Sequence, residues 1–354
     1  MHIAASTRAY ELWLADQLGD AFVRADLTVK HNKMRDGPFS FLRATYWRWA
    51  ETAPLICPLL MSAPRVLAVG DIHLENFGTW RDADGRLVWG VNDFDEAASM
   101  PFAFDLVRLA TSALLARKRR DGEAQTICAA ILAGYHAGLR NPGAIVLDRD
   151  AAWLRRIVEV GNKARAAFWR GLPQKIAPKA PPRFITALNR AMPARDCTFR
   201  VFRRVAGAGS LGRLRLLAQA DWRGAPVLRE AKALAPSAWP LAQGGRDKQI
   251  AARHAATGAF RSPDPWMAWD NAIVVRRLSP NNRKIEAATD GMILLRSDML
   301  AAMGHDLASI HLGGGKPASA IDAYLATEAE GWLANAATAM SQAVRADYKS
   351  FLRP

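Results

Sequence analysis

The chain has little acid, few cysteines and no long apolar run. It carries 33 Asp and Glu against 48 Lys and Arg, a formal net charge of +15 over 354 residues. Its three cysteines have neither CxxC nor metal-ligand spacing, which argues against a disulfide framework or a zinc site and predicts buried reduced thiols. No apolar run reaches the length of about 18 residues that a membrane span needs, and the first residues lack a signal pattern. We therefore expect a cytoplasmic protein.

The excess of basic residues would suit nucleic acid, a membrane surface or an acidic substrate. An arginine-rich composition spread over a solvated surface is the plainer interpretation. The basic residues cluster once, at 162–204, where eleven Lys and Arg face only Asp196. This stretch is rich in proline and lacks interleaved aromatic residues on a recognisable nucleic-acid-binding fold. The stretch predicts a connector between two parts of the chain, and a phosphate-rich ligand is the partner that its charge would suit. We expect no nucleic-acid partner.

An acidic segment stands out against this basic background. Between residues 71 and 105 there are eight carboxylates and two arginines. Clustered carboxylates favour a bound cation, and carboxylate and amide oxygens suit Mg²⁺ or Mn²⁺ better than zinc. The carboxylates are Asp71, Glu75, Asp82, Asp84, Asp93, Asp95, Glu96 and Asp105.

Two short apolar runs lead into this acidic segment. Residues 66–69 and 87–91 both have the composition of buried strands. The first ends at Gly70-Asp71, and the second follows a turn at 82–85 and leads to Asn92-Asp93-Phe94-Asp95. We expect adjacent strands that present carboxylates at the same end.

Helical spacing predicts much of the remaining chain to be helix. Asp105 is placed to act as the N-cap of a helix that follows it. Residues 32–43 predict a turn followed by alternating aromatic residues. The other expected helices are 7–18, 123–139, 148–169, 245–256 and much of 297–352.

The character of the sequence changes at Cys197, after which a glycine-rich segment lies between strand patterns. Residues 207–212 match GxGxxG, which is a weak signal alone. In a dinucleotide-binding fold the last glycine would open a helix. Here 213–218 alternates like a strand, a turn follows at 221–224, and 226–232 is strand-like again and ends in Lys232. This order is typical of the antiparallel sheet that covers ATP phosphates in kinases.

Further motifs carry a resemblance. Asp71 and Asn76 have the D-x-x-x-x-N spacing of the kinase catalytic loop, and Asp93-Phe94-Asp95 is similar to the metal-binding motif of protein kinases and aminoglycoside phosphotransferases. Over nearly its full length the chain resembles the uncharacterised bacterial family named domain of unknown function 2252. The motifs of that family found here are SFLR near residue 40, GDIHLENFG, NDFDE, FDLVRLATS, RRVAGAGSLG, LREAK, VVRRLSPNNRKIE and LASIHLGG near residue 310.

The resemblance implies an α+β, kinase-like two-lobe fold that is circularly permuted, because the glycine loop and lysine follow the catalytic aspartate instead of preceding it. The expected units are a helical catalytic lobe at 1–195, an antiparallel nucleotide-binding lobe at 196–285, and C-terminal helices at 286–354 that pack back on the catalytic lobe. Chain ends that lie close together would permit such a rearrangement.

The resemblance also implies a phosphotransferase that uses ATP and Mg²⁺ or Mn²⁺ and acts on a hydroxyl of a small molecule. The implied roles are Asp71 as acceptor of the hydroxyl proton, Asn76, Asp93 and Asp95 as metal ligands, Gly207, Gly209, Ser210 and Gly212 as the phosphate loop, and Lys232 as partner of the α- and β-phosphates.

Departures from the kinase pattern leave other functions open. Asp95 replaces the glycine of D-F-G, and no glutamate lies between Lys232 and Glu286 to serve as the usual partner of the lysine. Asp247 or Gln249 are the candidates to replace that glutamate. A non-catalytic nucleotide-binding regulator is therefore an alternative. Residues 70–73 are also similar to the first sequence motif of metallophosphoesterases, although the later histidines of a two-metal site are missing from the sequence.

Overall fold

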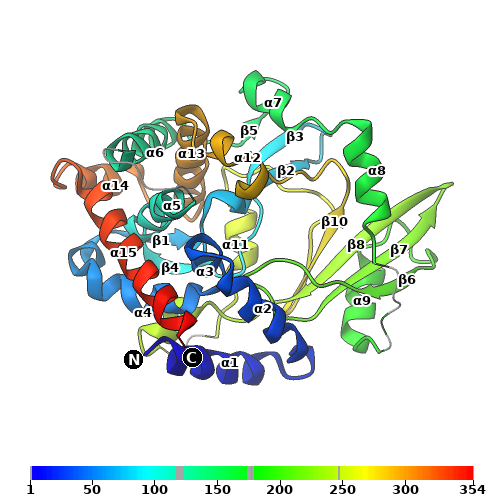
Figure 1. The fold of residues 1–354 in the computed structure, drawn as a ribbon. Coiled ribbons are helices and arrows are strands. Elements are labelled where there is room, and N and C mark those ends of the chain that lie inside the picture. The colour runs from blue at the N-terminus through cyan, green and yellow to red at the C-terminus, as the bar shows by residue number, and fades with distance from the viewer. Residues whose placement is uncertain (1, 117–122, 174–176, 178, 246–247, 354) are drawn as a thin grey trace.

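The computed structural model describes residues 2–116, 123–173, 177, 179–245 and 248–353. The fold is α+β, with many of the helices gathered on one side and a five-stranded sheet on the other (Figure 1). Helices α1 (Ile3–Leu18) and α15 (Trp332–Leu352) bring the two ends of the chain together, and the Ser350 hydroxyl lies 2.7 Å from His2 Nε2.

The largest sheet is antiparallel, with the strand order β6-β7-β8-β10-β9. Arg223 and Gly224 join β7 to β8 with φ angles of 53° and 79°, as a two-residue type I′ hairpin requires. The glycine segment 207–212 joins β6 to β7, so the predicted order of strand, glycine loop, strand, turn and strand is confirmed. The strands are β6 (Arg200–Arg203), β7 (Arg215–Trp222), β8 (Ala225–Ala233), β9 (Ala268–Asp270) and β10 (Ile273–Leu278).

The acidic segment lies on two smaller antiparallel sheets. One pairs β1 (Arg65–Ala68) with β4 (Ala98–Pro101), and the other has the order β2-β3-β5. Its strands are β2 (Phe77–Arg81), β3 (Leu87–Val91) and β5 (Ile145–Val146). The prediction that 66–69 and 87–91 form adjacent strands is therefore wrong. The chain beyond Asn76 forms β2, and β2 pairs with β3 instead.

Helices make up most of the rest. Helix α5 (Ala103–Leu115) is buried on nearly every side because α6, α15 and β4 all pack against it. The other α-helices are α2 (Ala25–Arg35), α3 (Pro38–Ala44), α4 (Tyr46–Ile56), α6 (Glu123–Arg140), α7 (Ala152–Val158), α8 (Asn162–Arg170), α9 (Pro182–Arg190), α10 (Ala238–Ala242), α11 (Ala252–Ala256), α12 (Ala287–Leu294), α13 (Ser297–Gly313) and α14 (Ala318–Leu325). Short 3-10 turns span Gly19–Ala21, Pro58–Ser62 and Leu74–Asn76.

Several predicted helix boundaries differ from the structure. The expected turn with alternating aromatics at 32–43 is the end of α2 followed by α3, which starts with proline at its first position. The helix expected at 148–169 is divided into α7 and α8, and of 245–256 only α11 is helical in the described residues. Asp105 is not an N-cap, since Phe102 holds that position and Asp105 lies within the first turn of α5.

The three cysteines, Cys57, Cys128 and Cys197, are buried free thiols, as predicted. Among the described helices, none has both the length and the apolar character that crossing a membrane would take.

Candidate active site

The loop after β1 is held from behind by a buried aspartate. Asp105 accepts hydrogen bonds from the backbone N–H groups of Val69 at 2.7 Å and Gly70 at 2.9 Å. His311 of α13 lies 3.1 Å from the same carboxylate, and the Tyr135 hydroxyl lies 2.8 Å from the other ring nitrogen of that histidine. Gly70 has a φ of 78°, a conformation that favours glycine. These contacts fix the direction of the loop just before residue 71.

Asp71 pairs with Arg108 of α5. Arg108 is fully buried, also donates to the Leu42 carbonyl at 3.0 Å, and lies 5.1 Å from the ring centroids of both Tyr46 and Trp49. Burial raises the pKa of Asp71 to about 7, although the charge of Arg108 acts to lower it. A carboxylate with a pKa near neutrality can accept and release a proton under physiological conditions.

Asn76 ties the two acidic loops together. Its Nδ2 donates to the backbone carbonyls of Asp71 at 3.2 Å and Asp93 at 3.0 Å, so the amide oxygen takes no part in these bonds. Nearby, His73 Nδ1 accepts a hydrogen bond from the backbone of Glu75 at 3.2 Å. Burial holds the pKa of His73 well below its usual value, which keeps the ring a neutral acceptor. The loops after β1 and β3 therefore meet, although the two strands belong to different sheets.

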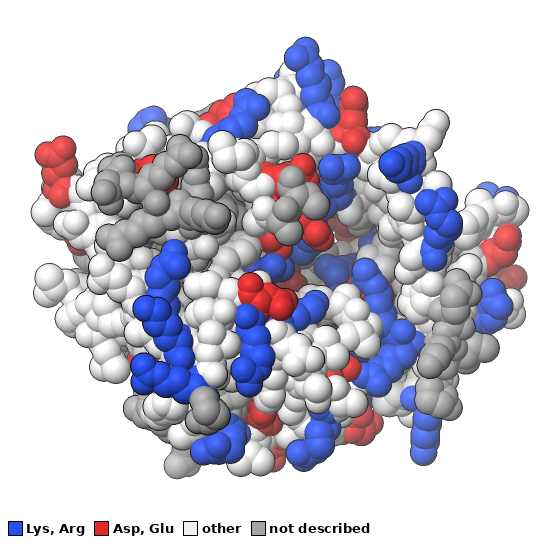
Figure 2. Space-filling view, viewed as in Figure 1, with Lys and Arg blue, Asp and Glu red and all other residues white. Residues whose placement is uncertain are grey.

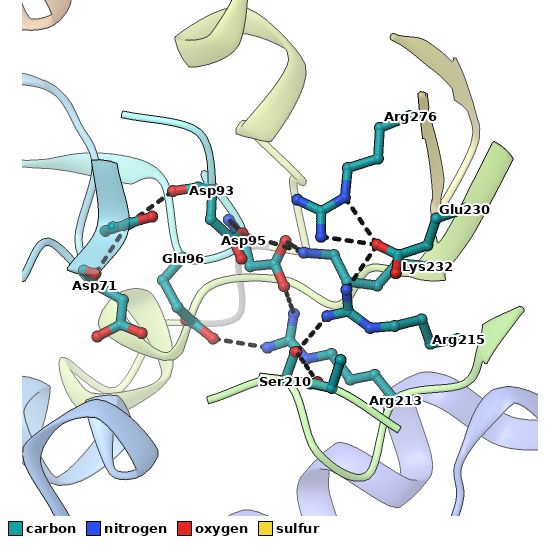
Figure 3. A network of polar contacts seen from close by, with 12 residues as sticks. Asp71, Asp93, Asp95, Glu96, Ser210, Arg213, Arg215, Glu230, Lys232 and Arg276 are labelled. Carbon is teal, nitrogen blue, oxygen red and sulfur yellow. Dashed lines mark hydrogen bonds and ion pairs between the residues drawn. The ribbon is translucent and has the colours of Figure 1, made fainter. Parts of the chain in front are cut away.

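Lys232 reaches the second acidic loop from the five-stranded sheet (Figure 3). Its Nζ lies 3.1 Å from Asp93 Oδ1 and 2.5 Å from Asp95 Oδ1, and its side chain is only 3% exposed. Burial acts to raise the pKa of Asp93, but the nearby cations, Lys232 foremost, outweigh it and hold that pKa well below its usual range. Burial and the Asp93 charge raise the pKa of Asp95. One ammonium group thus holds two aspartates.

Asp95 is an acidic partner of Lys232 that was not predicted for that role from the sequence. Of the two residues considered as replacements, Asp247 lies outside the described residues, and Gln249 lines a separate cavity beside Trp239. The contact of 2.5 Å shows Asp95 as the nearest acidic partner of Lys232. Within the described residues, Lys232 therefore has acidic partners although no glutamate lies between it and Glu286.

Arg213, just before β7, links that strand to the acidic loop after β3 (Figure 3). It donates to Glu96 Oε1 at 2.7 Å and lies 3.4 Å from Asp95 Oδ2. The other carboxylate oxygen of Glu96 accepts a hydrogen bond from the backbone of Ala238 at 2.7 Å. Glu96 thus joins the acidic loop both to the sheet and to α10.

Glu230, two residues before the lysine of β8, is surrounded by three guanidinium groups, and Figure 3 shows those of Arg215 and Arg276. It is fully buried and contacts Arg204, Arg215 at 2.7 Å and Arg276 at 2.7 Å. Burial acts to raise the pKa of Glu230, but the three arginines outweigh it and lower the pKa. Arg215 also donates to the Ser210 hydroxyl at 2.6 Å and so ties the glycine segment to the strand that follows it.

The glycine segment packs against Asp71. A Cβ atom on Gly209 would lie 3.0 Å from the Arg43 carbonyl and 3.2 Å from Asp71 Oδ2, so a side chain here would crowd the carboxylate. Gly212, at the far end of the segment, lies apart from this contact, and its carbonyl accepts a hydrogen bond from Val23 at 2.8 Å. The structure thus separates Gly212 from the other three residues predicted for the phosphate loop.

Around Asp71 there is a cavity of about 80 Å³. Two predicted site residues, Gly212 and Lys232, do not line it. The predicted residues that do are Asp71, Asn76, Asp93, Asp95, Gly207, Gly209 and Ser210. A cleft of about 1320 Å³ adjoins this cavity and shares Asp93 and Gly207 with it, within the hollow that Figure 2 shows on this face. A pocket of about 330 Å³ shares Arg276 with the cleft.

The oxygen atoms of Asn76, Asp93 and Asp95 are of the kind that a hard cation binds. Among the residues that the structure describes, no group of three or more His, Cys, Asp or Glu is placed to hold a metal ion. Asn76, Asp93 and Asp95 offer amide and carboxylate oxygens around one cavity, which is the chemistry that Mg²⁺ prefers. Lys232 now occupies one oxygen of each aspartate and would have to give way at Asp93.

Sequence reasoning missed the residues that hold these groups in place. Arg108 had a signal, because it and Asp105 are the only charged residues in the apolar sequence of α5. Arg213, Glu96 and Glu230 had none, because a strand or loop pattern does not say which distant residue a charge will meet.

Comparison with known proteins gives one match. No curated protein and no solved structure matches the chain. The family model described as "Uncharacterized protein conserved in bacteria (DUF2252)" matches residues 23–179 and 186–354, which include both acidic loops, the glycine segment and Lys232. The chain therefore belongs to the DUF2252 family of bacterial proteins.

Proposed function

We propose that the protein is an ATP- and Mg²⁺-dependent phosphotransferase with a circularly permuted, kinase-like two-lobe fold, acting on a hydroxyl of a small molecule. The observation that carries the proposal is the contact of Lys232 with Asp93 and Asp95 beside the cavity of Asp71. Kinases combine a lysine, a metal-binding aspartate, a catalytic-loop aspartate and a glycine loop in this way.

The chain ends support the permuted arrangement. His2 and Ser350 lie 2.7 Å apart at their side chains, and α1 packs against α15. A chain whose ends adjoin can begin at a different point and still form the same site. The division into units at 1–195, 196–285 and 286–354 remains a prediction of this proposal.

The nucleotide would lie across two of the described spaces. The pocket of about 330 Å³ would hold the base, because its lining is partly apolar and aromatic. Arg204, Arg276 and Lys284 line both this pocket and the cleft, so phosphates that leave the pocket would pass them toward the glycine segment. The larger apolar residues of the pocket are Trp80, Val91, Phe94, Phe168, Met267 and Leu278.

Asn76 and Asp93 would hold Mg²⁺. Bound ATP and Mg²⁺ supply the phosphoryl group and the charge that neutralises it. Asp95 was predicted as another metal ligand, but its contact of 2.5 Å gives better support to a role in anchoring Lys232. The lysine would then turn from Asp93 toward the phosphates while Asp95 keeps hold of it.

Asp71 would accept the proton of the substrate hydroxyl. Its pKa of about 7 is close to that of an efficient base at neutral pH. Arg108 holds one carboxylate oxygen and thereby orients the other toward the cavity side, where Gly209 lies. The glycine segment would exclude water from the reacting groups, because it already packs onto this carboxylate.

A nucleotide-binding regulator without transfer is the second candidate. It is favoured by the Lys232–Asp93 pair, which competes with a metal, and by the small size of the cavity at Asp71, about 80 Å³. No observation on the described residues favours the metallophosphoesterase.

Replacement of Asp71 tests the proposal. We expect Asp71→Asn to lower ATP turnover by about 1000-fold, the range of a lost general base, while ATP–Mg²⁺ affinity stays within about twofold. Turnover is measured as ADP release and affinity by calorimetry. Asp84→Asn is the matched control, because the Asp84 side chain is 76% exposed. Unchanged turnover in Asp71→Asn would contradict the assignment, and intact ATP binding without turnover in the wild type would favour the regulator.

A further inference from the structure

The cleft beside Asp71 is larger than a nucleotide requires. Its volume is about 1320 Å³, whereas pockets for small ligands span about 300 to 1,000 Å³. The base of the nucleotide is already assigned to a separate pocket. The cleft also shares Arg43, Glu75 and Asp93 with the cavity of Asp71. A second ligand therefore has room in the cleft and a short path to Asp71.

The lining of the cleft is strongly basic. Eight lysines and arginines line it against four carboxylates. Some of the cations are engaged, since Arg43 pairs with Glu75 at 2.6 Å and three arginines surround Glu230. The cations paired with carboxylates lie near the glycine segment or the acidic loop. Other cations that line the cleft belong to helices α2 and α15.

Three of those cations come from helices on the far side of the cleft from the sheet. Lys33 belongs to α2, and Arg345 and Lys349 belong to the C-terminal half of α15. In the described part of the chain, no ion pair joins any of the three to a carboxylate; Arg345 makes only a long contact of 3.5 Å with the Leu114 carbonyl. Like charges gathered without counter-ions raise the local concentration of anions.

The acids close to these helices do not neutralise the group. Arg48 donates to both carboxylate oxygens of Asp347 on α15, at 2.7 and 3.0 Å. Asp36, at the end of α2, also lines the cleft and is exposed, so one carboxylate stands against three cations on this wall. The wall keeps a net positive charge that faces the space beside Asp71.

We propose that the acceptor is a small hydroxyl compound with an anionic group, a phosphate or a carboxylate, bound by Lys33, Arg345 and Lys349. This rests on the proposed function. The anionic group would neutralise the helical wall, while the hydroxyl would face Asp71. In the reaction, the bond between the terminal phosphorus of ATP and its bridging oxygen breaks, a bond from that phosphorus to the hydroxyl oxygen forms, the hydroxyl proton goes to Asp71, and ADP leaves.

Binding of three small probes tests the proposal. Glycerol 3-phosphate, D-glycerate and neutral glycerol are titrated by saturation-transfer NMR, with and without a non-hydrolysable ATP analogue and Mg²⁺. The cleft variant is Lys33→Gln with Arg345→Gln and Lys349→Gln. The matched control is Arg8→Gln with Arg140→Gln and Arg253→Gln, three exposed arginines that do not line the cleft.

We expect at least one anionic probe to bind the wild type about tenfold or more tightly than glycerol. The cleft variant should lose about tenfold in that affinity, since each exposed charge pair contributes a few-fold, and the control should change by less than about twofold. Preference for glycerol 3-phosphate or for D-glycerate identifies the anionic group. Folding of both variants is checked by their thermal unfolding.

Three results would overturn the proposal: no anionic probe binding better than glycerol, the cleft variant binding like the wild type, or both variants losing affinity alike. Binding of an RNA oligonucleotide through the cleft residues, with neither small probe bound, would also overturn it and point to a polymer. Failure of the ATP analogue to bind is a separate outcome, which would contradict the proposed function whether or not the probes bind.

Discussion

Glu230 and Lys232 lie two residues apart on β8, and both are buried, yet their surroundings differ. The partners of Glu230 are Arg204, Arg215 and Arg276, which lie on strands of the same sheet or directly after one. The partners of Lys232 lie on the loop after β3, outside that sheet. One cluster holds the sheet together, whereas the other joins the sheet to the acidic loop. Under the proposed function, only the second has to change for a nucleotide to bind.

The largest effect is expected from removing the charge of Glu230. Glu230→Gln leaves three guanidinium groups around a neutral side chain, and loss of one partner from a buried ion cluster costs about 3–5 kcal/mol. We expect the free energy of unfolding, measured in urea, to fall by about that amount. The matched control, Glu159→Gln at an exposed position, should change it by less than about 0.5 kcal/mol. Equal effects at the two positions would contradict the structural role of the cluster.

Lys232→Met should give the opposite pattern. The free energy of unfolding should fall by only about 1–2 kcal/mol, because Asp95 keeps Arg213 as a partner. ATP–Mg²⁺ affinity should fall by about 30-fold, the value of a charge-assisted hydrogen bond to phosphate. Calorimetry and urea unfolding on the same sample measure both. If this variant loses stability like Glu230→Gln but keeps its ATP affinity, the two clusters do not differ as described.

The pH dependence of turnover should report Asp71. Its pKa is raised to about 7, so the base is increasingly protonated below that pH. We expect kcat/KM to fall about tenfold for each pH unit below 7 and to level off above it. The two aspartates affect the free energy of unfolding in opposite directions. The raised pKa of Asp71 makes its ionised form destabilising, so this free energy falls as the pH rises from about 4 to 7. The lowered pKa of Asp93 contributes stability above its unfolded value of about 4, and this stability is lost as the pH falls through the folded value. A flat rate profile from pH 5 to 8 would argue against Asp71 as the base.

The smallest effect is expected from Asp95→Asn. If Asp95 anchors Lys232, the Michaelis constant for ATP should rise about fivefold, while the Mg²⁺ dependence of turnover stays as in the wild type. If Asp95 binds the metal, the concentration of Mg²⁺ needed for half-maximal turnover should rise instead. Steady-state kinetics across a Mg²⁺ series separates the two roles.

Local patterns predicted the parts of the fold that depend on neighbours in sequence. The strands around the glycine segment and the turn at 221–224 follow from alternation and from Gly224, and they are confirmed. The turn predicted within 32–43 lies at Asp36 and Gly37, but the helix that follows it was not predicted, although Pro38 at its first position gave a local signal. The break between α7 and α8 within 148–169 was also missed, although Gly161, the N-cap of α8, gave a local signal.

Long-range pairing could not be predicted. The partner of β1 is β4 and the partner of β3 is β2, which sequence alternation alone does not determine. Of the predicted site, the spacing of Asp71 with Asn76 and of Asp93 with Asp95 identified loops that do meet. The contact of Lys232 with Asp95 joins residues 137 positions apart, and only the folded chain reveals it.

The most direct measurement is a calorimetric titration of the wild type and Asp93→Asn with ATP, in Mg²⁺ and in chelator. We expect the wild type to bind ATP more tightly with Mg²⁺ than with chelator, and Asp93→Asn to remove this difference. No binding by the wild type at millimolar ATP, or equal binding by both proteins in both conditions, would contradict these expectations.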